Sequence, residues 1–123
     1  MLAHECWFLV AEDDLNAARS LLKDELFASS MFHCQQSAEK VLKAYLAFKG
    51  EYLKKTHNLV NLLESCSIYD KAFSDLLNLV KNLNPLSTQF RYPDEYEIPD
   101  KEDAEEAFIQ AEEVFKFVKQ KIS

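Results

Sequence analysis

The stretch Phe32–Phe48, FHCQQSAEKVLKAYLAF, decides how the rest of the chain is interpreted. It contains neither proline nor glycine, and it is rich in residues that lose little side-chain freedom in a helix. At about 100° per residue, its apolar side chains gather on one broad arc. The arc contains Met31, Cys34, Ala38, Val41, Leu42, Tyr45 and Phe48. Gly50, the only glycine, is a natural C-cap residue, so we predict a long helix from about Leu26 to Lys49.

A polar strip runs along the same helix. It consists of Gln35, Gln36, Glu39, Lys40 and Lys43. Gln36, Lys40 and Lys43 lie opposite the apolar arc, whereas Gln35 falls inside it and must find a hydrogen-bond partner. One interpretation is a solvated face on which Glu39 and Lys43 pair at i,i+4. The other is a groove or dimer surface, where Gln35, Gln36 and Glu39 meet groups from another chain.

Amphipathic segments surround this central helix. Residues 4–24 repeat apolar side chains at three-four spacing, which predicts a first helix. The break at Asp24-Glu25 is short, so the first two helices should be antiparallel neighbours. After the second helix, Thr56 resembles an N-cap of a short third helix, with His57 in its first turn. Tyr69-Asp70 ends that helix.

The last third of the chain continues the helical pattern. A fourth helix should span Ala72 to Leu83 and end at Asn84-Pro85. Residues 85–100 hold all three prolines and are predicted to be irregular, and Asp100 should cap a final helix with Asp103 as its partner. We therefore predict one all-α domain over residues 1–123. Its expected architecture is an antiparallel up-and-down helical bundle of four long helices plus one short helix.

Charge limits the possible functions. The net charge of −7 argues against a broad electrostatic grip on nucleic acid, although a local basic patch remains possible. The middle of the chain is positive, and residues 94–113 contain ten acids and one base. The lysines of the middle segment are Lys40, Lys43, Lys49, Lys54 and Lys55.

Cysteine usage and hydropathy indicate the compartment. Cys6, Cys34 and Cys66 are odd in number and lack CxxC spacing, so we expect small buried hydrophobic side chains in a reducing cytoplasm. Neither a metal site nor a cofactor is expected. Early acidic residues argue against a signal peptide, and no apolar run reaches the ~18 residues of a membrane span. A cytoplasmic protein without membrane contact is expected.

Two groups of residues could bind a ligand. Arg91 offers a planar five-donor fork for phosphate or carboxylate, and Tyr92 could stack on a base. The alternative is a salt bridge from Arg91 to a nearby acid, with Tyr92 covering the bundle. His57 could serve as an acid or base, or could bind phosphate beside Lys54 and Lys55. Its alternative role is a helix-entry residue that packs on the bundle.

Several segments together resemble the HEPN domain, a family found in higher eukaryotes and prokaryotes. They are AEDDLNAARSLL, FHCQQSAEKVLKAYLAFKG, THNLVNLL, FRYPDEY and AEEAFIQAEEVFKFVKQ, and they cover nearly the whole chain. The resemblance implies a helical bundle, usually a homodimer, that is often the small partner of a minimal nucleotidyltransferase in prokaryotic toxin–antitoxin pairs. Such a protein would bind nucleotide or RNA.

Many HEPN proteins are metal-independent RNA-cleaving toxins with an Arg-x4–6-His motif. Arg91 matches the arginine, but Tyr96, Glu97 and Ile98 stand where the histidine belongs. Without that imidazole no group would shuttle the proton of the ribose hydroxyl, so we assign no catalytic residue and carry over Arg91 as a ligand contact. Two alternatives remain: a ribonuclease in which His57 replaces the missing histidine, and a ligand-free protein-interaction module.

Overall fold

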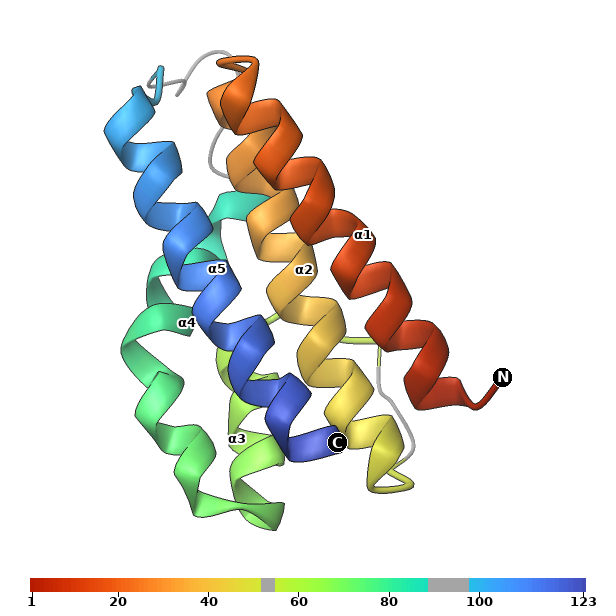
Figure 1. The fold of residues 1–123 in the computed structure, drawn as a ribbon. Helices are drawn as coiled ribbons and strands as arrows, with labels where there is room; N and C mark the ends of the chain where they lie inside the picture. Colours follow the sequence, from red (N-terminus) through yellow and green to blue (C-terminus); the bar gives the residue numbers. More distant parts are fainter. Residues whose placement is uncertain (52–54, 89–97) are drawn as a thin grey trace.

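A computed structural model describes residues 1–51, 55–88 and 98–123. Within these ranges all regular structure is helical, so the predicted all-helical fold is confirmed (Figure 1). The five α-helices are α1 (Ala3–Lys23), α2 (Phe27–Phe48), α3 (Leu59–Tyr69), α4 (Leu77–Leu83) and α5 (Lys101–Ile122). Two 3-10 helices, η1 (Lys71–Leu76) and η2 (Asn84–Ser87), flank α4.

The first two helices form the predicted antiparallel pair. A tight turn joins them, in which the backbone N–H of Leu26 donates to the carbonyl of Leu21 at 2.9 Å. Ser30 and Ser37 on α2 then donate hydroxyl hydrogen bonds to the carbonyls of Ala18 and Ala11 on α1, at 2.8 and 2.9 Å. All four of these side chains are buried, and their small size lets the two backbones approach closely.

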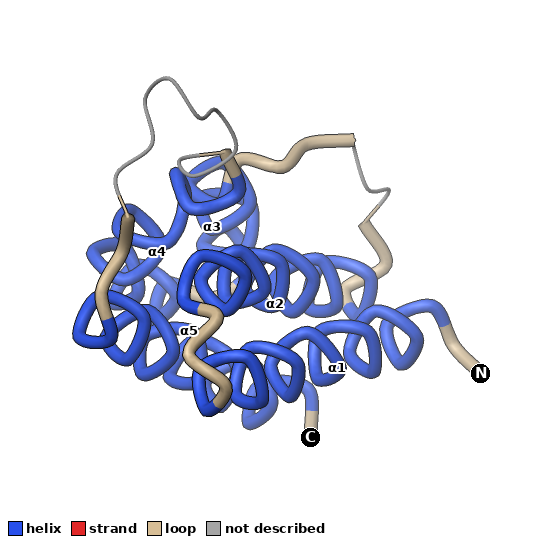
Figure 2. The backbone as a smooth tube through the Cα atoms, turned by 90° about the horizontal axis from the view of Figure 1, so that it is seen from above, coloured by secondary structure: helices blue, strands red, loops and turns tan. Residues whose placement is uncertain are grey.

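α2 lies at the centre of the molecule, as Figure 2 shows when the bundle is seen from above. α1 and α5 pack against one side of α2, and α3 packs against another side of it. Gly50 follows α2 with a φ of 77°, the left-handed conformation that glycine adopts most readily, and its N–H bonds the carbonyl of Ala47. The predicted end of the central helix is therefore confirmed.

α3 runs in the same direction as α2, which is a departure from strict up-and-down alternation (Figure 1). His57, just before α3, contacts Glu39, and Cys66, inside α3, contacts the carbonyl of Leu42. The ring of Tyr69 at its end meets that of Tyr45. α3 therefore begins beside the middle of α2 and ends near the end of α2.

The third and fourth helical segments differ in detail from the prediction. Asn58, not Thr56, is the N-cap of α3, and its side chain accepts from the N–H groups of Val60 and Asn61. His57 therefore precedes the helix.

The fourth helical segment is divided into η1 and α4. After Leu83 it continues through η2, where Pro85 occupies an early position that needs no N–H donor.

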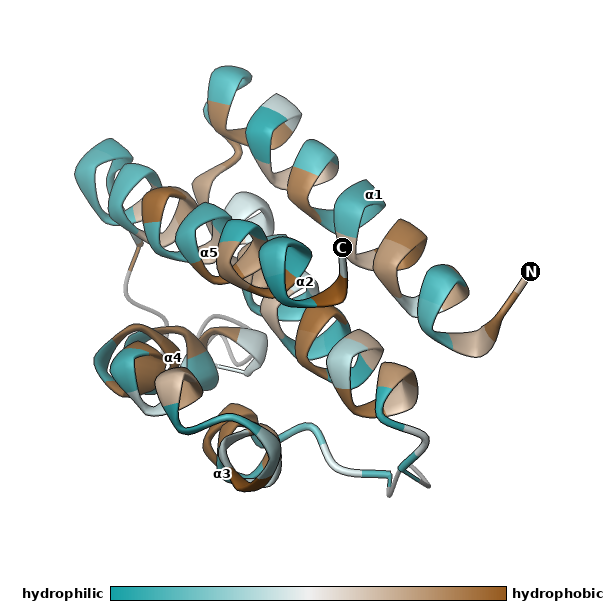
Figure 3. Ribbon diagram, turned by 60° about the horizontal axis from the view of Figure 1, so that its bottom comes forward, coloured by the Kyte–Doolittle hydropathy of each residue, from teal (hydrophilic) through white to brown (hydrophobic). Residues whose placement is uncertain are grey.

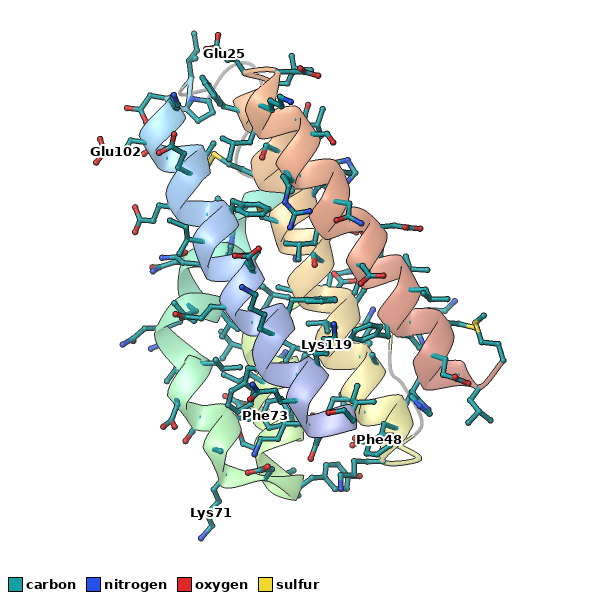
Figure 4. The ribbon with its side chains drawn as sticks, in the orientation of Figure 1. Glu25, Phe48, Lys71, Phe73, Glu102 and Lys119 are labelled. Carbon is teal, nitrogen blue, oxygen red and sulfur yellow. The ribbon has the colours of Figure 1, made fainter. Side chains whose placement is uncertain are left out.

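α5 begins as predicted. The Asp100 side chain accepts from the N–H of Asp103 at 2.8 Å, and the Asp103 side chain accepts from the N–H of Asp100 at 3.1 Å. Glu102 points away from the bundle in Figure 4, and Figure 3 shows the outer face of α5 as mainly hydrophilic. The inner face packs Val114, Phe115 and Val118 into the core.

Aromatic packing and two thiols complete the core. The ring of Phe73, which is fully buried, meets those of Tyr45 and Phe117 with centroid distances of 4.4 and 5.0 Å.

Burial raises the pKa values of the Cys34 and Cys66 thiols to about 12. Both match the expectation of buried cysteines, but Cys6 is exposed on α1, so the expectation was wrong for that residue.

We expect Phe73→Ala to lower the free energy of unfolding by about 3–5 kcal/mol, because it removes a large buried ring. Lys71→Ala is the matched control. Its side chain points away from the bundle in Figure 4, so its effect should stay within about 0.5 kcal/mol. Urea denaturation followed by circular dichroism measures both values, and equal effects would contradict the packing described.

Candidate functional site

Three residues of the predicted ligand site, Lys54, Arg91 and Tyr92, lie outside the described residues. The structure does place the polar strip of α2 together with His57 and Lys55. The site described below is therefore built on the face of α2 that His57 approaches. We call Glu39, Lys43 and His57 the Glu39 cluster.

Glu39 is the centre of this cluster. It is only 3% exposed, although it carries a carboxylate. Its Oε2 accepts from Nζ of Lys43 at 3.1 Å, and Nδ1 of His57 lies 3.1 Å from Oε1 and 3.2 Å from Oε2. A buried carboxylate is costly unless it is paired and hydrogen-bonded, and here both partners face it.

His57 is itself largely in contact with solvent. Its side chain is 76% exposed, whereas that of Glu39 is 4% exposed. The ring nitrogen that contacts Glu39 is Nδ1, so Nε2 takes no part in this contact. The result is an imidazole that is accessible to a ligand but held by a buried anion.

Gln35 and Gln36 form hydrogen bonds beside the Glu39 cluster, and one of them reaches the backbone of His57. Gln36 donates through Nε2 to Oε1 of Gln35 at 2.6 Å, and Gln35 donates through Nε2 to the carbonyl of His57 at 3.5 Å. Gln35 is fully buried, and these contacts are the partners that its position on the apolar arc requires. α2 therefore contacts both the ring and the backbone of His57.

Lys43 does not lie on a solvated face. It is 6% exposed, and its Nζ lies 5.3 Å from the ring centroid of Trp7 on α1, within range of a cation–π interaction. The i,i+4 pair of Glu39 and Lys43 is confirmed, but the solvated-face interpretation is wrong for these two residues. The periodicity of α2 alone could not show that Trp7 covers this position.

A second cluster joins α1 to α2, and we call it the Asp14 cluster. Asp14 is 8% exposed; Nδ1 of His33 lies 2.9 Å from its Oδ1, and Lys40 donates to its Oδ2 at 2.7 Å. Sequence reasoning missed Asp14. A signal was present, because Ala11, Asp14 and Ala18 share one face of α1 at helical spacing.

The two clusters determine which of the predicted basic side chains face solvent. Lys40 and Lys43 are each paired with a carboxylate, so their charges are largely compensated. Lys55 and His57 are exposed on the segment that precedes α3. A ligand could therefore reach Lys55 and His57 without breaking the ion pairs that hold Lys40 and Lys43.

Comparison with known proteins identifies the family. The family model of the HEPN domain matches residues 4–121. The chain belongs to the HEPN family. The resemblance carried by its motifs is thereby confirmed.

Relatives agree with this assignment. The chain is 33% identical to a Methanocaldococcus jannaschii protein named "Putative toxin MJ1304", over 89% of this chain and 81% of the relative. Among solved structures it is similar to TT1696 from Thermus thermophilus, with a TM-score of 0.88 and 27% identity over 98% and 99% of the two chains. It is also similar to ST0689, an archaeal HEPN homologue, with a TM-score of 0.80 and 30% identity over 100% of both chains.

Two further observations concern metals and membranes. Across residues 1–51, 55–88 and 98–123, no group of three or more His, Cys, Asp or Glu side chains is placed to hold a metal ion. In the same ranges no helix is both long enough and apolar enough to span a bilayer.

We expect Glu39→Ala to lower the free energy of unfolding by about 3–5 kcal/mol, because it leaves the ammonium of Lys43 buried without its anion. The double variant Glu39→Met/Lys43→Met removes both charges and conserves volume, so it should be far more stable than Glu39→Ala. Urea midpoints of the three proteins test this. A double variant as unstable as Glu39→Ala would show that the pair does not compensate the buried charge.

Proposed function

We propose that this HEPN protein is the small helical member of a toxin–antitoxin-like pair, and that it binds nucleotide or RNA. Two findings support the proposal. The HEPN domain covers residues 4–121, and a relative with 33% identity carries a toxin name. In this proposal the protein acts in the cytoplasm as a binding module.

The observation that carries the binding role is the geometry of His57. Its imidazole is 76% exposed, yet Glu39 and Gln35 hold its ring and its backbone. Lys55 lies two positions earlier and is also exposed. An imidazolium, whose Nε2–H stays available while Nδ1 donates to Glu39, and an ammonium are hydrogen-bond donors suited to a phosphate, and a fixed donor loses less entropy on binding than a mobile one.

The paired lysines take a different role in this proposal. Lys40 and Lys43 balance buried carboxylates, so they shape the face rather than contact the phosphate directly. Arg91, Tyr92 and Lys54 remain proposed ligand contacts on the basis of the sequence alone. The binding face thus depends on a few local donors, in keeping with a net charge of −7.

The proposed partners are a second copy of the chain and a minimal nucleotidyltransferase. Both follow from membership in the HEPN family rather than from a contact in the structure. Exposed apolar side chains on α1, at Leu9 and Val10, offer surface that such an association would cover.

We expect a short single-stranded RNA or ATP to bind in isothermal titration calorimetry, with the affinity falling as salt rises. His57→Gln and Lys55→Gln should each weaken binding about 10- to 100-fold, because each removes a donor to a charged group. Lys71→Gln changes the first residue of η1 and is a control that should leave the affinity unchanged. Absence of heat with RNA, ATP and the other nucleoside triphosphates would contradict the proposal.

We expect the purified chain to have the mass of a dimer in multi-angle light scattering, and to elute with a nucleotidyltransferase when the two are expressed together. Affinity capture from the native host, followed by mass spectrometry of the bound proteins, tests the second part. A strictly monomeric chain that captures no nucleotidyltransferase would contradict both partner assignments.

A further inference from the structure

Trp7, the single tryptophan of the chain, lies on α1 and differs from the other aromatic side chains in its surroundings. Phe8, the next residue, packs its ring against that of Phe115 with a centroid distance of 4.9 Å. Across the residues that the structure describes, Trp7 pairs with no aromatic ring, and it is not among the partly buried apolar side chains that pack on the core. Its indole lies instead against the ammonium of Lys43, 5.3 Å from Nζ to the ring centroid. Core packing therefore does not account for this tryptophan.

The indole N–H of Trp7 reaches solvent. Within residues 1–51, 55–88 and 98–123, every buried side-chain nitrogen or oxygen has a hydrogen-bond partner. Nε1 of Trp7 has no such partner in these ranges, although the residue is partly buried, so this nitrogen must be accessible. A buried tryptophan usually satisfies its N–H inside the protein, which is one reason that tryptophan is enriched where one end of the ring stays wet. Trp7 therefore offers a ligand both a flat apolar ring and a hydrogen-bond donor.

Trp7 and His57 meet the same buried ion pair from two different elements. The indole centroid lies 5.3 Å from Nζ of Lys43. That nitrogen donates to Glu39 at 3.1 Å, and Glu39 in turn lies 3.1 Å from Nδ1 of His57. α1 carries Trp7, α2 carries the ion pair, and His57 lies on the segment before α3. Because no step in this series is longer than 5.3 Å, one small ligand can contact both rings.

We propose that Trp7 stacks on the base of a nucleotide, free or in a single-stranded RNA, whose phosphate is bound at His57 and Lys55. The inference rests on the proposed function, which supplies the nucleotide and the position of its phosphate. It adds the residue that recognises the base. A nucleotide joins a charged phosphate to a flat base through one ribose, and this matches charged donors at one end of the ion pair and an indole at the other.

Stacking also suits the charge of the protein. The net charge is −7, and Lys40 and Lys43 are each paired with a carboxylate, so electrostatic attraction to a phosphate is limited on this face. A ligand would gain affinity here from a contact that does not depend on charge. Stacking of a base on an aromatic side chain is such a contact, and it accepts different bases because each of them has a π-face.

Trp7 could instead serve only to cover Lys43, and the two roles predict different losses. If the ring only covers the ammonium, its removal disturbs Glu39 and His57, and any phosphate binds less tightly, with or without a base. If the ring stacks on the base, its removal weakens binding only of a phosphate that carries a base. A nucleotide and a phosphate without a base therefore distinguish the two roles.

The test measures binding of ATP and of inorganic tripolyphosphate to the full chain by isothermal titration calorimetry. We expect Trp7→Leu to weaken ATP binding about 5- to 100-fold and to leave tripolyphosphate binding unchanged. Trp7→Phe keeps an aromatic ring and should retain most of the ATP affinity. Tyr69→Leu is the matched control, because it removes a 45% exposed ring at the end of α3, and it should change neither affinity.

Tryptophan fluorescence gives a readout that needs no variant, because the chain has a single tryptophan. ATP and oligoadenylate should quench the emission over the concentration range in which calorimetry shows binding, whereas tripolyphosphate should not. Equal ATP affinities of Trp7→Leu and the unchanged protein, equal losses for ATP and tripolyphosphate, or ATP binding without quenching would each overturn this inference alone. Failure of both ATP and RNA to bind at all would instead overturn the proposed function.

Discussion

The carboxylate of Glu39 is the constraint around which this part of the molecule is organised. It lies on the central helix with 3% of the residue exposed, and an uncompensated charge in that place would be strongly destabilising. Lys43 supplies the compensating charge from the next turn, and Trp7 of α1 covers the ammonium. The imidazole of His57 covers the carboxylate from the other side. One buried charge thus links α1, α2 and the segment before α3.

The direction of α3 follows from the same arrangement. His57 contacts Glu39, which lies two to three turns before the end of α2. α3 then starts beside the middle of α2 and descends parallel to it, with Cys66 near Leu42 and Tyr69 near Tyr45.

Much of the fold could be predicted from local patterns. The tight break at Asp24-Glu25, Gly50 after α2, and the Asp100–Asp103 capping box are all determined by neighbouring residues, and sequence alone places them correctly. Lys43 and Asp14 could not be placed in this way, because their burial depends on side chains from another helix. The cap of α3 was misassigned since Thr56 and Asn58 are both suitable caps, and the position of His57 against α2 selects the second.

The net charge of the protein does not by itself oppose a phosphate at His57, because several of the acidic side chains lie on α5. The exposed acids Glu102, Glu105 and Glu113 belong to α5, which packs on α2 from its apolar arc. His57 contacts Glu39 on the polar strip of α2, and Lys55 lies two positions before it in the chain. A helix with its side chains is about 10 Å wide, and the Debye length at physiological ionic strength is about 8 Å. Solvent therefore screens most of the repulsion from α5, and the potential at His57 is set by its near neighbours. Among these, Glu39 is balanced by Lys43, so a bound phosphate would interact with the imidazole and with Lys55 against a nearly neutral background.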